Sequence, residues 1–222
     1  MTDVIALGEL LIDFAHKSSD SAGYPTLAAQ PGGAPGNFLA ALQRYGCSTA
    51  LLGKVGDDTF GHLLINTLQE LGIGTKGILR DPAVFTTLAF VTLDSTGNRE
   101  FSFARKPGAD TCLTAGEVDY SLIDGARVFH FGTLSLTAEP ARAATRAAVA
   151  YARRAGRLVS FDPNLRKPLW ASEAEAKEQM EWGLGQSDIV KISDEEVDFL
   201  WGLSPEEGAQ RLLKEYAVKL VY

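Results

Sequence analysis

The sequence predicts an α/β fold in which helices cover a central, mainly parallel sheet. Short apolar runs rich in β-branched residues alternate with segments of helical periodicity, which is typical of successive βα units. Of the 222 residues, 45% are hydrophobic, so the chain can bury a sizeable core. Neither an internal repeat nor a low-complexity linker divides the sequence. We therefore expect one domain over residues 1–222.

Six apolar segments are predicted as strands of this sheet. They are Val4–Gly8, Thr49–Gly53, Val128–Phe131, Leu158–Asp162, Ile189–Ile192 and Val218–Val221. Helical patterns lie between most of them, as connections between parallel strands require.

Five segments are predicted as helices: Asn37–Tyr45, Thr59–Leu71, Glu139–Ala155, Ala174–Trp182 and Pro205–Tyr216. Gly46, Gly72 and Gly156 stand just past the ends of the first three, where glycine commonly terminates a helix. Asp57 and Asp58 precede the second helix, where an aspartate can cap the first N–H groups.

One region interrupts this alternation. Thr86–Leu93 and Arg99–Arg105 are both strand-like, and the residues between them, Asp94–Asn98, have the composition of a turn. Phe101 and Phe103 share one face of the second strand. These features predict an antiparallel hairpin outside the parallel sheet, placed as a small flap over a ligand site.

The composition excludes several classes of protein. The formal net charge is 21 − 28 = −7, which disfavours a nucleic-acid partner because such proteins need a basic face. Cys47 and Cys112 form no CxxC pair, so we expect neither a disulfide framework nor a structural zinc site. No segment is long and apolar enough to predict a membrane span. We expect a cytoplasmic protein.

The most informative local motif is Pro31–Asn37, a glycine-rich loop that opens the first predicted helix. Glycines let the backbone approach a ligand closely, and the N–H groups at a helix start point toward it. The Asn37 amide can both donate to and accept from hydroxyl groups. The alternative is an ordinary glycine turn with Asn37 as a cap. The spacing matches neither a Walker A loop nor a dinucleotide-binding loop.

Polar residues also follow two predicted strands. Asp13 comes after Leu7–Ile12, where a carboxylate can accept hydrogen bonds from sugar hydroxyls, although a solvated loop aspartate is the commoner explanation of a single such residue. Asp162–Arg166 gathers an acid, an amide and a guanidinium at a strand end, but an Asx-capped turn has the same composition. His62 and His130 lie within predicted elements and are interpreted as structural.

Together, a series of motifs resembles the ribokinase-like (PfkB) carbohydrate kinases and, within them, the fructokinase branch. In chain order they are Gly8-Glu9 with Leu11-Ile12-Asp13, Pro31–Asn37, Gly53–Asp58 with Phe60-Gly61, Arg105 with Pro107–Asp110, Phe129–Gly132, Asp162–Arg166 with Leu169-Trp170, and Lys191-Ile192-Ser193 with Glu195-Glu196. The resemblance extends over essentially the whole chain.

This resemblance implies a ribokinase-like fold: a central, mainly parallel sheet with flanking helices and a small β lid, formed by segments of about 13–30 and 84–106. It also implies phosphoryl transfer from ATP with Mg²⁺ to a sugar hydroxyl, fructose to fructose 6-phosphate above all, and a homodimer formed through the lid. By the same analogy, the sugar would contact Asp13, Gly32, Gly33, Asn37 and, from the lid side, Arg105.

The phosphate and nucleotide side of the site is likewise assigned by the resemblance. It comprises Asp162, Asn164, Arg166, Lys191, Ser193 and Glu196, with Glu196 organising Mg²⁺ indirectly. Ser193 departs from the family pattern, which carries an asparagine at that position.

The family's second signature, Asp-Thr-Thr-Gly-Ala-Gly-Asp, does not occur in the sequence. In the family it supplies the catalytic aspartate and the anion hole, most of the adenine pocket belongs to the same region, and it would follow a strand such as Val218–Tyr222. We therefore expect a fold truncated at its C-terminus, no catalytic residue in this chain, and little or no activity of the chain alone. The alternatives are a non-catalytic sugar-binding or interaction module, a kinase for 2-keto-3-deoxygluconate or another sugar, and a nicotinamide-dependent oxidoreductase.

Overall fold

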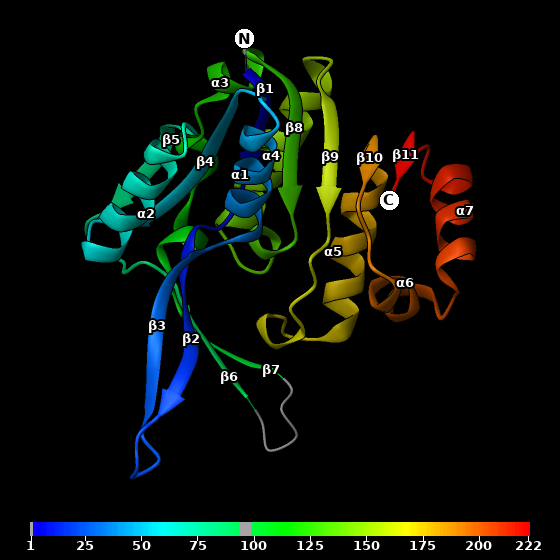
Figure 1. Cartoon of the computed structure of the whole chain (residues 1–222). Helices are drawn as coiled ribbons and strands as arrows, with labels where there is room; N and C mark the ends of the chain where they lie inside the picture. Colours follow the sequence, from blue (N-terminus) through cyan, green and yellow to red (C-terminus); the bar gives the residue numbers. More distant parts are fainter. Residues whose placement is uncertain (1, 94–98) are drawn as a thin grey trace.

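The computed structural model describes residues 2–93 and 99–222. They form a seven-stranded sheet with helices on both faces and a separate four-stranded sheet that projects from one end of it (Figure 1). The predicted fold class is confirmed. None of the helices in this part of the chain is both long and apolar enough to cross a membrane.

The large sheet has the strand order β11-β10-β9-β8-β1-β4-β5, and every neighbouring pair is parallel. Its strands are β1 (Thr2–Leu7), β4 (Thr49–Gly56), β5 (Gly74–Asp81), β8 (Ala126–Gly132), β9 (Leu158–Asp162), β10 (Ile189–Val190) and β11 (Leu220–Val221). All six predicted strands are present. The sequence analysis missed β5, because this edge strand buries only Ile78 and so lacks an apolar run.

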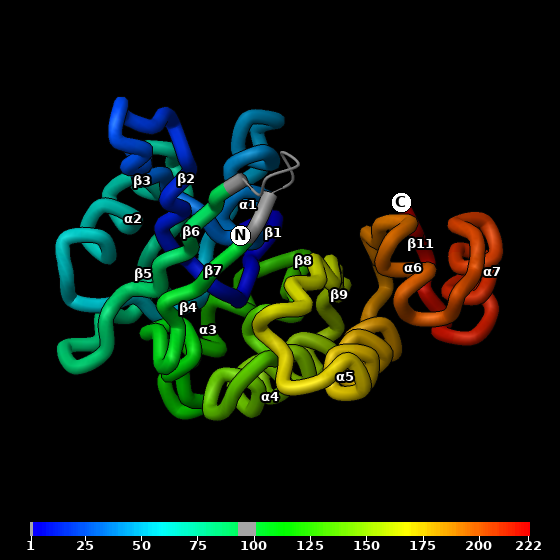
Figure 2. The backbone as a smooth tube through the Cα atoms, turned by 90° about the horizontal axis from the view of Figure 1, so that it is seen from below, coloured from blue at the N-terminus to red at the C-terminus, as the bar shows by residue number. Residues whose placement is uncertain are grey.

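Two helices, α1 (Ala34–Arg44) and α2 (Thr59–Glu70), cover one face of the sheet. The opposite face carries α3 (Tyr120–Asp124), α4 (Ala141–Arg154) and α5 (Glu173–Gly185), and Figure 2 shows the two helical layers on either side of the strands. At the β11 end of the sheet lie α6 (Asp194–Trp201) and α7 (Pro205–Glu215).

Two differences from the predicted helices stand out. Helix α1 begins at Ala34 rather than Asn37, because Pro35 and Gly36 form its first turn and proline is well tolerated there. Helix α6 was not predicted, since its first turn is three acidic residues and only Val197 and Leu200 supply a buried apolar face.

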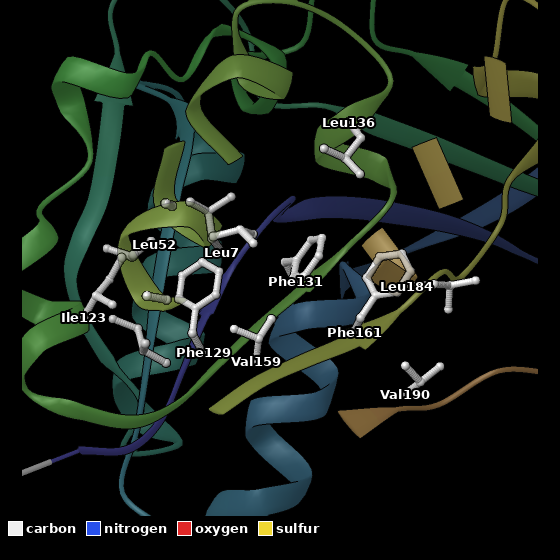
Figure 3. Packing of buried hydrophobic residues seen from close by; sticks show 14 of the residues in the cluster. Leu7, Leu52, Ile123, Phe129, Phe131, Leu136, Val159, Phe161, Leu184 and Val190 are labelled. Carbon is white, nitrogen blue, oxygen red and sulfur yellow. The ribbon is translucent and has the colours of Figure 1, made fainter. Parts of the chain in front are cut away.

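The core is divided into two apolar clusters by the large sheet. On β1, Ile5 and Leu7 belong to the cluster beneath α4 and α5, whereas Val4 and Ala6 belong to the one beneath α1 and α2. This alternation follows from the two-residue repeat of a strand. Strands buried on both faces read as nearly continuous apolar runs, which is why the sequence revealed them. Figure 3 shows Phe129, Phe131, Phe161 and their neighbours in the first cluster.

The smaller sheet, called the lid here, has the strand order β3-β2-β6-β7. Its strands are β2 (Leu11–Ser19), β3 (Pro25–Gly32), β6 (Leu88–Leu93) and β7 (Arg99–Ala104). Strands β6 and β7 pair antiparallel, which confirms the predicted hairpin; its predicted turn at 94–98 lies outside the described residues. Strand β2 joins β6 in parallel and β3 in antiparallel orientation, so the two hairpins form one sheet.

Candidate functional site

A cavity of about 370 Å³ lies where the lid meets the carboxyl ends of the large sheet's strands. Ligand sites of open α/β sheets form at these ends because the loops that follow the strands converge there. Its lining includes polar residues, namely Glu9, Asp13, Asn37, Asp162, Asn164 and Arg166, and apolar residues, namely Leu11, Phe38, Phe101, Phe103 and Leu134. Gly33 and Ala34 complete the wall.

The glycine loop provides the inner wall. Gly33 is the residue before α1, and its backbone has φ 111° and ψ 121°, a conformation that favours glycine. A side chain there would place its Cβ 2.5 Å from the backbone oxygen of Glu9. The loop therefore packs against the chain that leaves β1, and this contact presents the first turn of α1 to the cavity.

Gly32 and Asp13 approach each other across the β2–β3 pair. Gly32 lies beside Leu11 in the register, and a Cβ on Gly32 would overlap the Asp13 carboxylate. Asp13 lines the cavity and is half-buried, and this burial raises its pKa, while the Arg166 charge opposes the rise. The absence of a side chain at Gly32 thus gives the Asp13 carboxylate its space.

Asn37 lies on the first turn of α1 and is exposed toward the cavity that it lines. Its backbone N–H donates to Gly33 O at 3.1 Å, which is an ordinary helical bond. Within residues 2–93 and 99–222, no group hydrogen-bonds to its side-chain amide, so the amide's donor and acceptor atoms are available to a ligand. The side chain is therefore not the helix cap that the alternative interpretation required.

The loop after β9 provides the opposite wall. Asn164 has φ 45°, a left-handed conformation that asparagine tolerates better than most residues, and its N–H donates to Asp162 Oδ1 at 3.1 Å. Lys191 Nζ lies 3.3 Å from the same carboxylate. Burial raises the pKa of Asp162, Lys191 opposes this rise and the Glu196 charge reinforces it. Arg166 stacks on Phe101 of the lid, with 5.5 Å from its guanidinium carbon to the ring centre.

Ser193 and Glu196 lie outside the cavity lining and form a capping box at the start of α6. The Ser193 N–H donates to Glu196 Oε2 at 3.0 Å, and the Glu196 N–H donates to Ser193 Oγ at 3.3 Å. The second carboxylate oxygen of Glu196 accepts the N–H of Leu165 at 2.7 Å. Glu196 therefore connects α6 to the loop that carries Asn164 and Arg166, and both of its oxygens already accept backbone hydrogen bonds.

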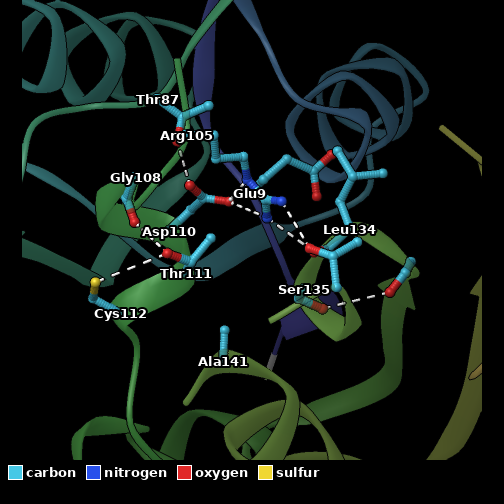
Figure 4. Close-up of polar contacts among 12 residues, drawn as sticks. Glu9, Thr87, Arg105, Gly108, Asp110, Thr111, Cys112, Leu134, Ser135 and Ala141 are labelled. Carbon is cyan, nitrogen blue, oxygen red and sulfur yellow. Dashed lines mark hydrogen bonds and ion pairs between the residues drawn. The ribbon is translucent and has the colours of Figure 1, made fainter. Parts of the chain in front are cut away.

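Of the predicted sugar contacts, Gly32 does not line this cavity, and neither does Arg105. The Arg105 guanidinium donates to Asp110 at 2.9 and 2.6 Å and to Leu134 O at 2.9 Å (Figure 4). It also donates to Thr137 Oγ1 at 2.7 Å. These contacts occupy most of its five N–H groups. Arg105 instead lines a neighbouring cavity of about 500 Å³, together with residues that include Lys106 and Trp170.

The cavity also contains residues that the sequence analysis did not assign to the site. Glu9, Phe101, Phe103 and Leu134 all line it. A signal for Glu9 was available, since it is a carboxylate directly after a strand-like run, as Asp13 is. The aromatic pair was recognised as one face of a strand, but the face that turns to the ligand depends on how the lid packs.

Phe38 lines the cavity and stacks on His130, with 4.1 Å between the ring centres. Burial lowers the pKa of His130 to about 3, so the imidazole is neutral and shares a 3.0 Å hydrogen bond with Ser160. His62 lies on the exposed side of α2 beside Asp57. Neither imidazole lines the cavity, which agrees with a structural interpretation of both.

A family model described as "pfkB family carbohydrate kinase" matches residues 1–222. Among curated proteins, fructokinase-2 of Solanum lycopersicum is 46% identical over 201 residues, which cover 90% of this chain. The chain spans 61% of the length of that relative.

Solved structures of fructokinases are also similar to this chain. Fructokinase from Xylella fastidiosa with bound ATP has a TM-score of 0.87 at 32% identity, covering 99% of this chain and 67% of its own. Fructokinase from Vibrio cholerae with fructose, ADP and calcium has a TM-score of 0.86 at 34% identity, covering 100% of this chain and 70% of its own.

Proposed function

Because the chain belongs to the pfkB family of carbohydrate kinases, we propose that it serves the ATP-dependent transfer of a phosphoryl group to a sugar hydroxyl, with fructose as the substrate. The observation that carries this proposal is the 370 Å³ cavity between the lid and the strand ends. Its carboxylates and amides suit hydroxyl groups, and its aromatic wall suits the apolar face of a sugar ring.

The sugar would be held by Asp13, by the backbone of Gly32 and Gly33, and by the free amide of Asn37. Carboxylate and amide groups form the directional hydrogen bonds that fix a polyol in one orientation. Arg105 would support the site by holding Leu134 and the end of β7, since its guanidinium bonds the Leu134 carbonyl.

The charges of the cavity favour a neutral sugar over a sugar acid. Three carboxyl groups, those of Glu9, Asp13 and Asp162, line it with one guanidinium, that of Arg166. An anionic substrate such as 2-keto-3-deoxygluconate would meet a net negative wall, and like charges at short range in a partly buried site repel strongly. This observation favours fructose over that alternative.

The residues near Asp162 fit a nucleotide phosphate and Mg²⁺. Lys191 is partly exposed beside Asp162 and can meet a phosphate oxygen. No cluster of three or more His, Cys, Asp or Glu side chains suited to a metal occurs in the described residues. Mg²⁺ characteristically binds through one or two carboxylates together with substrate phosphates and water. We therefore propose that Asp162 and the phosphates would hold the ion, with Glu196 fixing the adjacent loop.

The Gly-Ala-Gly-Asp segment of the family has no counterpart in these 222 residues. We propose that these residues alone bind the sugar without turning it over, because phosphoryl transfer depends on the positioning and charge stabilisation that this segment provides. A homodimer through the lid and a reducing compartment such as the cytoplasm belong to the same proposal; the free thiols of Cys47 and Cys112 support the latter.

The test is calorimetric titration of the 222-residue chain with fructose, combined with an ADP-release assay. We expect saturable fructose binding, at least tenfold weaker in Asn37→Ala because a ligand-facing amide is lost, at about 1.4 kcal/mol per tenfold. The matched control is Asn66→Ala, an exposed asparagine on α2, which should bind as the parent chain does. Absence of fructose binding in the parent chain would refute the proposal.

A further inference from the structure

Glu9 occupies an unusual position for an acidic side chain. It follows β1 and Gly8, the residue is only 3% exposed, and it lines the sugar cavity. Buried carboxyl groups are costly unless other groups pair with them or hydrogen-bond to them. A carboxyl group in this position therefore needs hydrogen-bond donors inside the site.

The described contacts of Glu9 leave part of its carboxyl group unused. Oε1 accepts the N–H of Ala34 at 2.9 Å, and the group also interacts with its own backbone N–H. A carboxylate has about four acceptor positions, so capacity remains for a further donor. The Ala34 bond fixes the group against the first turn of α1, next to the glycine loop.

The cation whose charge acts on Glu9, that of Arg105, forms no ion pair with it in the described residues. Figure 4 shows Glu9 beside Arg105, but the guanidinium is directed to Asp110, Leu134 and Thr137. In the described part of the chain, Glu9 forms no ion pair. The Asp110 carboxylate in turn offsets the Arg105 charge, with which it forms a 2.6 Å ion pair. The negative charge of Glu9 is thus balanced only weakly by neighbouring cations, and its carboxyl group can accept a hydrogen bond from a ligand in the cavity.

We propose that Glu9 is a specificity-determining residue: it accepts a hydrogen bond from a sugar hydroxyl and excludes sugars that carry a carboxylate in its reach. This inference rests on the proposed function and deepens it. A hydroxyl group supplies the missing donor without bringing charge. A carboxylate supplies no donor and adds a second negative charge at close range, which a buried site penalises.

The charged groups around Glu9 comprise three acids and two arginines. Across the cavity, Asp13 on β2 and Asp162 on β9 are acidic, and Arg166 is the cation of the lining. From the segment behind the cavity, Arg105 favours the ionised form of Glu9 and Asp110 disfavours it. Burial is the largest influence and raises the pKa of Glu9 to about 7. The group is therefore mainly ionised at pH 8 and mainly protonated at pH 6.

The test compares fructose and 2-keto-3-deoxygluconate binding by calorimetry in the 222-residue chain and in Glu9→Gln, which keeps the size of the side chain and an acceptor for Ala34. At pH 8 we expect fructose to bind about tenfold more weakly to the variant, because the charge-assisted hydrogen bond is lost. The sugar acid should bind about threefold or more tightly to the variant, because its repulsion is removed. At pH 6 both differences should shrink to about twofold or less, since most of the parent Glu9 is then protonated and uncharged.

The opposite signs for the two sugars distinguish specificity from general damage to the site. Equal weakening of both sugars, or no change in either, would overturn the inference while leaving the proposed function intact. If the parent chain binds neither sugar, the proposed function fails and this inference fails with it. Glu70→Gln, an exposed glutamate on α2, is the matched control and should change neither affinity.

A second variant keeps the test valid if Glu9→Gln does not fold, as judged by circular dichroism. Glu9→Asp retains the charge but withdraws it from the cavity by one methylene. We expect it to lose fructose affinity by about tenfold and still to reject the sugar acid. Unchanged fructose affinity in Glu9→Asp would contradict the proposed hydroxyl contact.

Discussion

At the scale of single residues, the shape of the cavity depends on positions where the backbone leaves no room for a side chain. Gly33 combines a positive φ with a close approach to the Glu9 carbonyl, and Gly32 leaves space for the Asp13 carboxylate. The carboxylates and amides that face the ligand can occupy their positions only because these two residues have no side chain. This loop therefore requires glycine for two reasons, the backbone conformation and the close packing.

We expect Gly33→Ala to lower the free energy of unfolding by about 2 kcal/mol or more and to abolish fructose binding. Part of the loss is the strain of a positive φ, about 1–2 kcal/mol for a residue with a Cβ. The rest is the collision with the Glu9 oxygen. Urea denaturation measures the loss.

Gly46→Ala separates these two contributions, because Gly46 has φ 85° and no atom lies within 4 Å of the position that an added methyl group would take. It should lose only the strain, about 1–2 kcal/mol, and keep its affinity for fructose. Equal losses of stability and affinity in the two variants would contradict this account of the loop.

Glu9 should also make stability depend on pH. Its pKa rises from 4.5 in the unfolded chain to about 7 in the folded chain because of burial. Between these values the folded state binds the proton that the unfolded state has released, so stability falls as pH rises from about 4.5 to 7 and levels off above. At about 1.4 kcal/mol per pKa unit, this contribution is about 3 kcal/mol.

Glu9→Gln removes this group, so the stability of the variant relative to the parent should increase with pH across the same interval. Urea denaturation at a series of pH values gives the difference, in which the other carboxyl groups cancel. A difference that stays constant from pH 4 to pH 8 would show that Glu9 is not the buried acid inferred from its surroundings.

At the scale of secondary-structure elements, two α-helices of the described residues, α6 and α7, begin with a serine–glutamate capping box in different surroundings. Ser193 and Glu196 start α6, and Ser204 and Glu207 start α7. Of these two carboxylates, that of Glu196 also accepts a backbone N–H from outside its helix, that of Leu165. This bond connects the start of α6 to the loop of the candidate site, so the capping box also stabilises a tertiary contact.

We expect Glu196→Ala to cost about 2–4 kcal/mol of stability, and Glu207→Ala about 1 kcal/mol or less. Both variants lose a cap, but only the former leaves a partly buried N–H, that of Leu165, without its charged acceptor. The Glu196 variant should also bind ATP more weakly, since the loop with Asn164 and Arg166 is released. Thermal or urea denaturation and nucleotide titration measure both effects, and equal costs in the two variants would contradict the proposed link.

At the scale of the whole molecule, Arg105 is a major polar connection between the lid and the large sheet. It follows β7 of the lid and bonds Leu134 and Thr137 in the segment after β8, with its charge balanced by buried Asp110. Thr87, beside β6, donates to the same aspartate at 2.5 Å. The position of the lid over the cavity thus depends on one buried group of polar side chains.

Arg105→Ala should therefore lower stability by about 3–5 kcal/mol, because the buried Asp110 charge loses its partner. Arg105→Lys keeps the charge but not the forked geometry, so it should cost less and still weaken fructose binding by displacing Leu134. Denaturation and calorimetry give the two quantities. Arg127→Lys, an exposed arginine paired with Asp3, serves as the control and should change neither.

The sequence by itself determined the fold class and most strands, because strands buried on both faces are apolar throughout and helix ends carry glycine and capping residues. The glycine loop, Asp13 and the Asp162–Arg166 loop could also be identified from the sequence, since each of them follows a strand or opens a helix. The edge strand β5 was not predicted, because most of its residues are not buried and its sequence therefore resembles that of a loop.

Only the tertiary structure decided which of these groups meet. Whether Arg105 faces a ligand or a buried partner depends on Asp110 and Leu134, which no local pattern identifies. The same holds for Glu9, whose burial and raised pKa arise from the packing of the glycine loop and the lid around it. Local sequence specifies where a chain turns, whereas the environment of a charge is set by residues distant in sequence, and the chemistry of this site depends on that environment.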